Sequence, residues 1–220
     1  MEISTFLILS AYFWGAIPTA YLTGRYINGV DIRTYGSGNV GAANLTETTN
    51  RLIGTTVGVF DCVGKGTLPI FVATLLDVPT TVQVMVGLAT VSGHNWSPYM
   101  RFRGGRGIAT SIGVLLGFLM WPELLFGVII LGIGGVVIMR ETALFTLLVI
   151  VILPFIGVLF NRPPEFVNMA IALGLILITK RLVANWESPH YKYPLSKVLL
   201  YRLLWDRDVR YKNEWTSRQL

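Results

Sequence analysis

Seven apolar runs, separated by short polar breaks, are the feature that most limits the folds open to this chain. A helix needs about 20 mostly apolar residues to cross roughly 30 Å of hydrocarbon. The sequence therefore predicts an all-α integral membrane protein with about seven transmembrane helices, some short or re-entrant, joined by cytoplasmic glycine-rich loops. The expected spans are Ile3 to Leu22, Leu52 to Leu76, Val78 to Val91, Ile108 to Met120, Leu124 to Met139, Ala143 to Phe160 and Phe166 to Ile178.

The low content of charged residues favours the same fold class. Charged residues make up 14% of the chain, against about a quarter in an ordinary soluble domain. The first run has no basic region before it and no small-residue cleavage pattern, so we expect a retained helix rather than a removed signal. The single cysteine, Cys62, excludes an intrachain disulfide and a thiol-rich metal site. We expect neither a metal nor another cofactor.

The basic residues predict the orientation of the chain, because loops rich in Lys and Arg tend to stay in the cytoplasm. With the amino terminus outside and the carboxyl terminus cytoplasmic, only Arg162 of the 18 basic residues lies in an external loop. Nine others follow Ile178, in a tail that also carries aromatic residues. Such a tail suits lipid headgroups; the alternative is a solvated tail that only sets the topology. The net charge of +6 thus has an orientational explanation, and we expect no nucleic-acid partner.

The first predicted cytoplasmic loop is rich in glycine and small polar residues. Glycine allows backbone amides to turn towards an oxyanion, and the neighbouring side chains can add donors. This makeup predicts a phosphate-binding loop; the alternative is a flexible turn between two helices. The candidate binding residues are Gly36, Ser37, Gly38, Asn39, Gly41 and Asn44.

The second cytoplasmic loop places glycines around an arginine directly before an apolar helix that opens at Ile108. A helix start offers free amides and the positive end of the helix dipole, and an arginine adds a fixed charge with fork geometry. The loop therefore predicts a second anion site, with a basic juxtamembrane anchor as the alternative. The candidates are Gly104, Gly105, Arg106 and Gly107.

Two ionisable residues lie inside the second predicted span. Asp61 and Lys65 are four residues apart, on one helix face, where opposite charges can pair. Charges at such depth usually serve function or face a polar cavity, and a purely structural pair is the alternative. His94 could act as a base near neutral pH or hydrogen-bond within its loop. Cys62 is interpreted as a packing residue.

The two loop motifs together, Gly36 to Asn44 and Gly93-His94-Asn95-Trp96 through Gly107, closely resemble the bacterial membrane acyl-phosphate:glycerol-3-phosphate acyltransferase family (PlsY family). The likeness covers roughly residues 3 to 187. It implies a polytopic membrane acyltransferase-like domain over residues 1–187, followed by a basic, aromatic cytoplasmic tail over residues 188–220. It also implies seven spans with an external amino terminus, in the bacterial inner membrane.

In that family an acyl group passes from acyl phosphate to glycerol 3-phosphate, giving 1-acyl-glycerol 3-phosphate and phosphate in the first step of phospholipid synthesis. The resemblance implies that both substrates and membrane lipid are partners of this chain. It predicts catalytic roles for Ser37, His94 and Asn185. It predicts that the two loops, Lys65 and Arg181 bind substrate.

Four positions depart from the family pattern. Glu47 stands where the first motif ends in an arginine that engages the acceptor phosphate, and Arg51, one turn further on, is a candidate replacement. Ala43 replaces a threonine, and Arg106 replaces a lysine. The family's third motif is an arginine-histidine pair followed three residues later by asparagine; here Arg181 and Asn185 match it, and Leu182 replaces the histidine. These departures keep a divergent paralogue open, either with another acceptor or as a non-catalytic binder of acyl phosphate or lipid. A small anion transporter is the remaining alternative, because intramembrane charges are expected there too.

Overall fold

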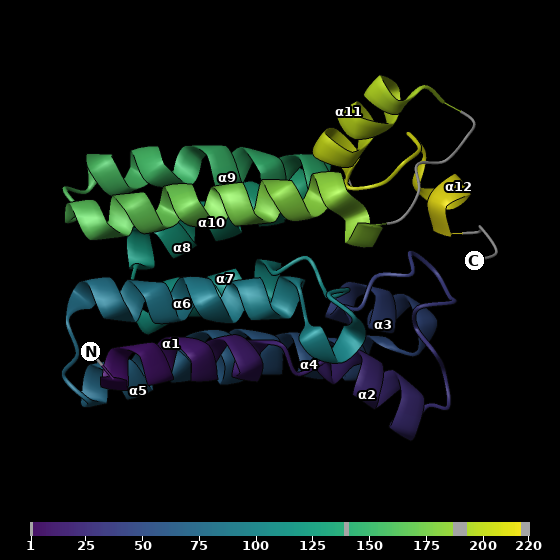
Figure 1. The fold of residues 1–220 in the computed structure, drawn as a ribbon. Coiled ribbons are helices and arrows are strands. Elements are labelled where there is room, and N and C mark those ends of the chain that lie inside the picture. The colour runs from purple at the N-terminus through teal and green to yellow at the C-terminus, as the bar shows by residue number, and fades with distance from the viewer. Residues whose placement is uncertain (1, 139–140, 187–192, 217–220) are drawn as a thin grey trace. The chain divides into compact units, whose positions relative to one another are not determined.

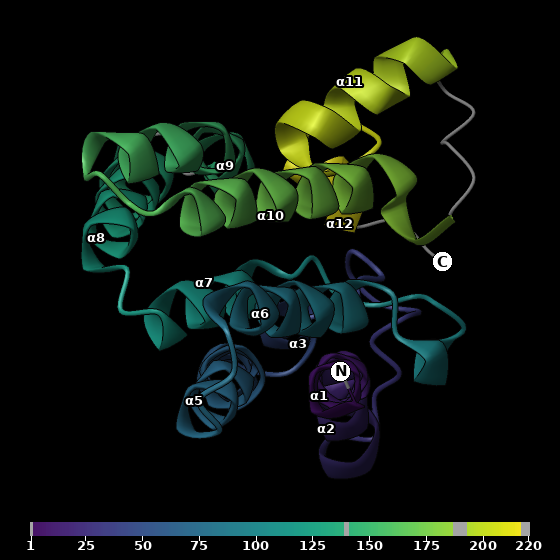
Figure 2. The same ribbon diagram turned by 60° about the vertical axis from the view of Figure 1, so that its left-hand side comes forward.

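The computed structural model describes residues 2–138, 141–186 and 193–216 of the chain. All regular secondary structure within these ranges is helical, as expected from the sequence. The helices form two compact units, Met1–Phe118 with Asn213–Leu220, and Leu119–Lys212 (Figure 1, Figure 2). Met139, at the end of the fifth predicted span, and residues 188–192 and 217–220 of the predicted tail lie outside the described residues.

The first unit contains one helix that changes its winding along its length. The α-helix α4 (Arg51–Val59) continues as the π-helix η1 (Phe60–Thr67) and then as α5 (Leu68–Leu75). The remaining helices of this unit are α1 (Glu2–Gly15), α2 (Thr19–Ile27), α3 (Ala42–Thr48), α6 (Thr80–Asn95), the 3₁₀ turn η2 (Pro98–Met100) and α7 (Ile108–Gly117).

Glycine contacts allow the helices of this unit to pack at very short range. A Cβ atom added at Gly15 of α1 would collide with the Thr90 backbone of α6, and one at Gly93 of α6 would collide with the Tyr12 carbonyl. A Cβ atom added at Gly66 of η1 would likewise collide with the backbone of α7, and one at Gly113 of α7 would collide with the backbone of η1. Small residues are typical of close helix contacts in membranes. These contacts place α1, η1, α6 and α7 side by side, which positions the two loops described below.

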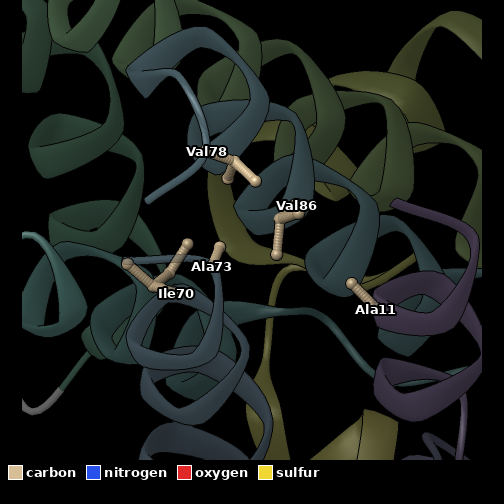
Figure 3. Close-up of a cluster of buried hydrophobic side chains, with 5 residues drawn as sticks. All are labelled: Ala11, Ile70, Ala73, Val78 and Val86. Carbon is tan, nitrogen blue, oxygen red and sulfur yellow. The ribbon is translucent and has the colours of Figure 1, made fainter. Parts of the chain in front are cut away.

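A small apolar core lies at one end of this helix group. Its buried side chains come from α1, α5 and α6 and from the connection between the last two. Figure 3 shows them facing one another: Ala11, Ile70, Ala73, Val78 and Val86.

The second unit is built on an antiparallel pair, α9 (Thr142–Leu159) and α10 (Pro164–Val183), which pack together. The helix α8 (Trp121–Ile129) continues into the π-helix η3 (Ile130–Ile138), and η3 contacts α9. A 3₁₀ turn, η4 (Ala184–Trp186), ends α10, and α11 (Leu195–Trp205) then packs against α9 and α10 (Figure 2). The short helix α12 (Lys212–Thr216) begins at the last residue of this unit.

Helix covers most of each of the seven predicted spans, although the first is divided into α1 and α2 at residues 16–18 and the end of the fifth lies outside the described residues. Among the described residues, four helices are long and apolar enough to cross a membrane: Ile3–Ile27, Arg51–Leu75, Thr142–Leu159 and Pro164–Trp186. The third, fourth and fifth predicted spans correspond to α6, α7 and α8 with η3; the apolar stretches Ile108–Gly117 and Trp121–Gly135 are shorter. The predicted boundaries differ from the observed ones by a few residues, because the ends of apolar runs do not mark helix caps.

Candidate functional site

A buried polar cluster forms around the two charges predicted in the second span. Lys65 Nζ lies 2.7 Å from Asp61 Oδ1, and both side chains are at most 2% exposed. Lys65 also donates to the Ile17 carbonyl at 2.6 Å and to Thr19 Oγ1 at 2.9 Å, while the Thr19 hydroxyl donates to Asp61 Oδ1 at 2.7 Å. His94 Nδ1 lies 4.0 Å from Asp61 Oδ2. The predicted pairing of Asp61 with Lys65 is therefore confirmed.

The Lys65 ammonium group makes two hydrogen bonds and one ion pair within the cluster. An isolated buried charge would be very costly, and a neighbouring charge together with full hydrogen bonding makes it tolerable. Two of the partners, Ile17 and Thr19, flank Pro18, where the first apolar run breaks between α1 and α2. Sequence analysis did not select Thr19, although this proline-marked break was the available signal.

The π-helical winding brings its own backbone into this cluster. The Trp14 indole N–H donates to the Gly64 carbonyl at 2.7 Å, and the Thr90 hydroxyl donates to the Lys65 carbonyl at 3.1 Å. Side chains from α1 and α6 thus bond two carbonyls of η1. π-Helical turns occur often at functional sites, and this one carries both buried charges.

The first glycine-rich loop is organised by Asn44, which is 1% exposed. Its amide nitrogen donates to the carbonyls of Ile32 and Tyr35 at 2.7 and 3.1 Å, and its Oδ1 accepts from the Ser37 backbone N–H at 3.0 Å. Gly36 has a φ of 58°, in the left-handed region that favours glycine. A Cβ there would also collide with Asn44 Oδ1. Asn44 therefore holds the curvature of the predicted phosphate loop.

An ion pair lies just before this loop, outside the spanning helices. The Arg33 side chain donates three hydrogen bonds to the Asp31 carboxylate, from Nε to Oδ1 at 2.9 Å, from Nε to Oδ2 at 3.2 Å and from Nη2 to Oδ2 at 2.6 Å. The hydrogen bonds and the charge of Arg33 lower the pKa of the Asp31 carboxyl group below its usual value. This contact fixes the chain where it enters the loop.

The second loop folds back on His94. The Gly105 N–H donates to the His94 carbonyl at 3.0 Å. A Cβ at Gly105 would collide with His94 Nε2, and one at Gly104 would collide with the His94 carbonyl oxygen. Gly107, with a φ of 77°, then starts α7. A side chain at either position fits against the histidine only if the loop or the imidazole ring shifts.

Two buried hydroxyls follow this turn in the first helical residues of α7. Thr110 is 0% and Ser111 7% exposed, and within the described part of the chain neither hydroxyl has a hydrogen-bond partner. Buried hydroxyls are normally paired. They are therefore candidate ligand contacts that sequence analysis did not select.

The two loops and the buried cluster meet at one small pocket of the first unit. Its wall consists of Ala16, Ile17, Pro18, Thr19, Val40, Lys65, His94, Ser97, Gly104 and Gly105. A Cβ built on Gly41 would lie 3.8 Å from the Gly105 Cα atom, so the loops are in direct contact. The cavity volume is about 10 Å³, room for about one water molecule. A phosphate group can enter only if the loops move apart.

The two predicted residues of the third motif belong to the second unit. Arg181 donates to the Leu203 carbonyl at 3.1 Å and to the Ala143 carbonyl at 3.0 Å. Asn185 Oδ1 accepts from Lys180 Nζ, whose side chain is fully buried. Ala184, Asn185 and Trp186 all have a positive φ, so Asn185 lies in a strained turn. Such backbone strain is typical of functional sites.

An arginine of the tail completes this arrangement. Arg202 of α11 donates to the Leu182 carbonyl at 3.0 Å and forms a two-point ion pair with Asp208, at 2.5 and 3.0 Å. Arg181 of α10 in turn donates to Leu203 of α11. Each helix therefore supplies an arginine to the carboxyl end of the other. Lys180 and Arg202 could not be predicted from the sequence as site residues, because no local pattern distinguishes them from other basic residues.

The sequence-predicted residues thus fall into two groups. Lys65, His94, Gly104 and Gly105 line one pocket, and Gly41 of the first loop lies against it. Gly36, Ser37, Gly38 and Asn39 lie in the loop that leads to Gly41, and Asn44 of α3 bonds the backbone of that loop. Arg106 and Gly107 follow Gly105. Arg181 and Asn185 lie in the second unit.

Comparisons with known proteins match most of the chain. The family model described as glycerol-3-phosphate acyltransferase matches residues 5–187. Relatives from Dehalococcoides mccartyi, named glycerol-3-phosphate acyltransferase 5 and 4, are 37% and 40% identical to this chain, over 96% of it and 92% of each relative. A crystal structure of PlsY (YgiH), described as an integral membrane glycerol 3-phosphate acyltransferase in its glycerol 3-phosphate form, is 29% identical with a TM-score of 0.73, over 81% of this chain and 88% of that one.

Proposed function

This chain belongs to the glycerol-3-phosphate acyltransferase family, and from that premise we propose that it transfers an acyl group from acyl phosphate to glycerol 3-phosphate. The products are 1-acyl-glycerol 3-phosphate and inorganic phosphate, and the reaction is the first step of phospholipid synthesis. The observation that supports this most is the contact of two glycine-rich loops beside the buried pair of Asp61 and Lys65. Glycine-rich backbone with adjacent positive charge is the chemistry that binds phosphate.

The protein is a multi-pass membrane protein, as its apolar helices and its similarity to an integral membrane enzyme indicate. We place it in the bacterial inner membrane with the amino terminus outside. The basic loops and the tail over residues 188–220 then face the cytoplasm, where phosphorylated substrates are available. The distribution of lysine and arginine supports this orientation.

The reaction proceeds by direct attack, because acyl phosphate is a mixed anhydride with a good leaving group. The acceptor hydroxyl oxygen forms a bond to the acyl carbon, and the bond from that carbon to the phosphate oxygen breaks. The hydroxyl proton passes to a substrate phosphate oxygen, and inorganic phosphate leaves. Because the acceptor attacks the acyl carbon directly, no covalent enzyme intermediate forms. The protein contributes positioning and charge stabilisation.

The residue roles follow from chemistry and contacts in the first unit. The loop segments Ser37 to Gly41 and Gly104 to Gly107, with Arg106, hold the phosphate groups, and the Ser37 side chain lies in the first of these loops. The Ser37 N–H donates to Asn44 Oδ1 and the Gly105 N–H donates to the His94 carbonyl, so these two amides bind a phosphate only by exchanging those bonds. Lys65 supports the pocket wall through its two hydrogen bonds and its ion pair with Asp61, and a phosphate binds it only by replacing one of these contacts. His94 orients the second loop and the reacting groups. Arg181 and Asn185 remain predicted contributors on the basis of the motif resemblance.

Turnover by purified protein tests the proposal. Palmitoyl phosphate and glycerol 3-phosphate are supplied in detergent, and phosphate release is followed together with the lysophosphatidic acid formed. Formation of both products in equal amounts is expected. Release of phosphate without lysophosphatidic acid, or no reaction under conditions where a related acyltransferase works, contradicts the assignment. An acyl-phosphate-binding assay then distinguishes a silent binder.

A further inference from the structure

A second pocket lies in the other unit, between the start of α9 and the chain that follows α11. Its volume is about 350 Å³, within the range of small-molecule sites. Its walls differ in character: Leu144, Phe145 and Trp205 are apolar, and the other lining residues are Glu141, Arg207, Arg210, Tyr211 and Lys212. The pocket is therefore amphipathic.

The polar wall carries more positive than negative charge. Arg207 forms an ion pair with Glu141, with Nη2 at 2.6 Å from Oε2, and also donates to backbone carbonyls of its own loop. This pair is neutral overall and ties the loop to the start of α9. Arg210 and Lys212 add two further cations to the wall. Within the described residues, the Arg210 guanidinium has no ion pair, and its carbon lies 5.9 Å from the centre of the Tyr211 ring.

The pocket lies at the first turn of a candidate membrane span. Thr142–Leu159 is the most apolar of the candidate spans, and Leu144 and Phe145 belong to its first turn. Glu141 is the N-cap residue of that helix. A cavity at the first turn of a spanning helix meets the interface between hydrocarbon and water, where aromatic and basic side chains are favoured.

An apolar stripe continues from the pocket along α9. Leu148, Val151, Phe155 and Leu159 follow Leu144 at spacings of three or four residues, so they share one helix face. All four are exposed, from 42% for Leu148 to 69% for Phe155 and Leu159. A ligand with its polar group in the pocket can therefore lay an apolar chain along this face.

We propose that this pocket binds an anionic phospholipid, with the phosphate group against Arg210 and Lys212 and an acyl chain along the α9 stripe. Apolar walls beside basic ones, continuous with a lipid-facing helix face, match an anionic amphiphile better than a small soluble anion. The site lies wholly in the second unit and does not depend on the proposed acyl transfer. Residues 188–220, which supply five of its eight lining residues, lie beyond the match to the family model.

Trp205 in the pocket wall provides a direct test. Purified full-length protein in phosphatidylcholine nanodiscs is titrated with brominated phosphatidylglycerol, and separately with brominated phosphatidylcholine. Bromine quenches tryptophan fluorescence on contact. The Trp205→Phe variant reports the quenching of the other tryptophans, and the difference between the native protein and this variant is the Trp205 component. We expect the Trp205 component to be quenched at a much lower fraction of phosphatidylglycerol than of phosphatidylcholine.

Charge variants identify the binding groups. Arg210→Gln and Lys212→Gln should each weaken the phosphatidylglycerol response about fivefold, the effect of one basic residue at an anionic surface. Lys197→Gln, an equal charge change on exposed α11 surface away from the pocket, should leave it unchanged. Arg210→Lys, which keeps the charge, should retain the response.

Three outcomes would overturn the proposal. The first is equal quenching of the Trp205 component by both lipids, and the second is an unchanged response in both Arg210→Gln and Lys212→Gln. The third is displacement of brominated phosphatidylglycerol by millimolar inorganic phosphate, which would assign the pocket to free phosphate. Size-exclusion chromatography of each variant confirms that the folded protein is being compared.

Discussion

Lys65 Nζ lies 2.7 Å from Asp61 Oδ1, one turn earlier in the same π-helix, with both side chains almost fully buried. Thr19 bridges the two groups, accepting from the lysine and donating to the carboxylate. The pair therefore connects η1 to the break between α1 and α2 at the wall of the proposed phosphate site. The two buried charges compensate each other, so the stability of each charged group depends on the presence of the other.

Removing one member of this pair should strongly destabilise the protein. Asp61→Asn leaves the Lys65 ammonium buried without its counter-charge, a change that costs about 3–5 kcal/mol in comparable pairs. The midpoint of thermal unfolding in detergent measures the loss. Asp31→Asn, which breaks an exposed pair, is the control and should shift the midpoint far less. Similar shifts for both variants would contradict the burial argument.

Gly105→Ala should remove activity without a comparable loss of stability. The added methyl group collides with His94 Nε2 at a turn where the loop can shift, and a displacement of about 1 Å near reacting groups can cost on the order of 100-fold in rate. Gly132→Ala is the matched control, because no atom lies within 4 Å of its added Cβ. Phosphate release and the unfolding midpoint are measured together. Full activity of Gly105→Ala would exclude a tight fit of this loop to His94.

The spanning helices could be predicted from the sequence because hydropathy is a local property. Each predicted run is largely helical within the described residues, and the spacing of Asp61 and Lys65 correctly placed them on one face. The π-helical winding could not be predicted in this way. Its carbonyls at Gly64 and Lys65 accept hydrogen bonds from side chains of α1 and α6. Those donors are distant in the sequence, and no pattern within residues 60–67 indicates them.

The candidate site was predictable only where its chemistry is carried by a compact motif. The glycines of the two loops were selected for phosphate binding, and the structure brings Gly41 and Gly105 together. Sequence spacing could not reveal that Asn44 bonds backbone groups of its own loop, because side-chain direction depends on the folded loop. Likewise, the contact of Arg181 with Leu203 depends on how α11 docks.

Arg202→Gln should loosen the end of α10 and the segment after α11. The change leaves the buried Asp208 carboxylate without its ion-pair partner and weakens the bond to the Leu182 carbonyl, so a loss of about 3–5 kcal/mol is expected. Hydrogen exchange of residues 180–186 should increase with it. Lys197→Gln is the control on the same helix. Unchanged exchange in Arg202→Gln would show that α11 does not hold the third motif.

The Asp31–Arg33 pair should give a small, pH-dependent contribution to stability. Because Arg33 lowers the pKa of folded Asp31, the contribution is fully present above the unfolded pKa of about 4 and is lost as the pH falls through the lower folded value. Both side chains are partly exposed, so it should not exceed about 1 kcal/mol. The difference in unfolding midpoint between the native protein and Asp31→Asn should shrink below about pH 4. A difference that grows in acid would contradict this sign.

The charges of Glu47 and Arg51 should affect acceptor binding in opposite directions. Both side chains are exposed, Glu47 near the end of α3 and Arg51 at the start of α4. If the acceptor phosphate is held near this junction, Glu47→Arg replaces repulsion by attraction and should lower the KM for glycerol 3-phosphate on the order of fivefold, whereas Arg51→Ala should raise it similarly.

Steady-state phosphate release at varied glycerol 3-phosphate measures both effects, with kcat as the internal reference. Arg25→Ala, an exposed charge change on α2, is the control and should leave KM unchanged. A change confined to KM indicates acceptor binding, since an effect on the chemical step would lower kcat as well. An unchanged KM in both Glu47→Arg and Arg51→Ala would mean that the acceptor phosphate is bound away from the α3–α4 junction.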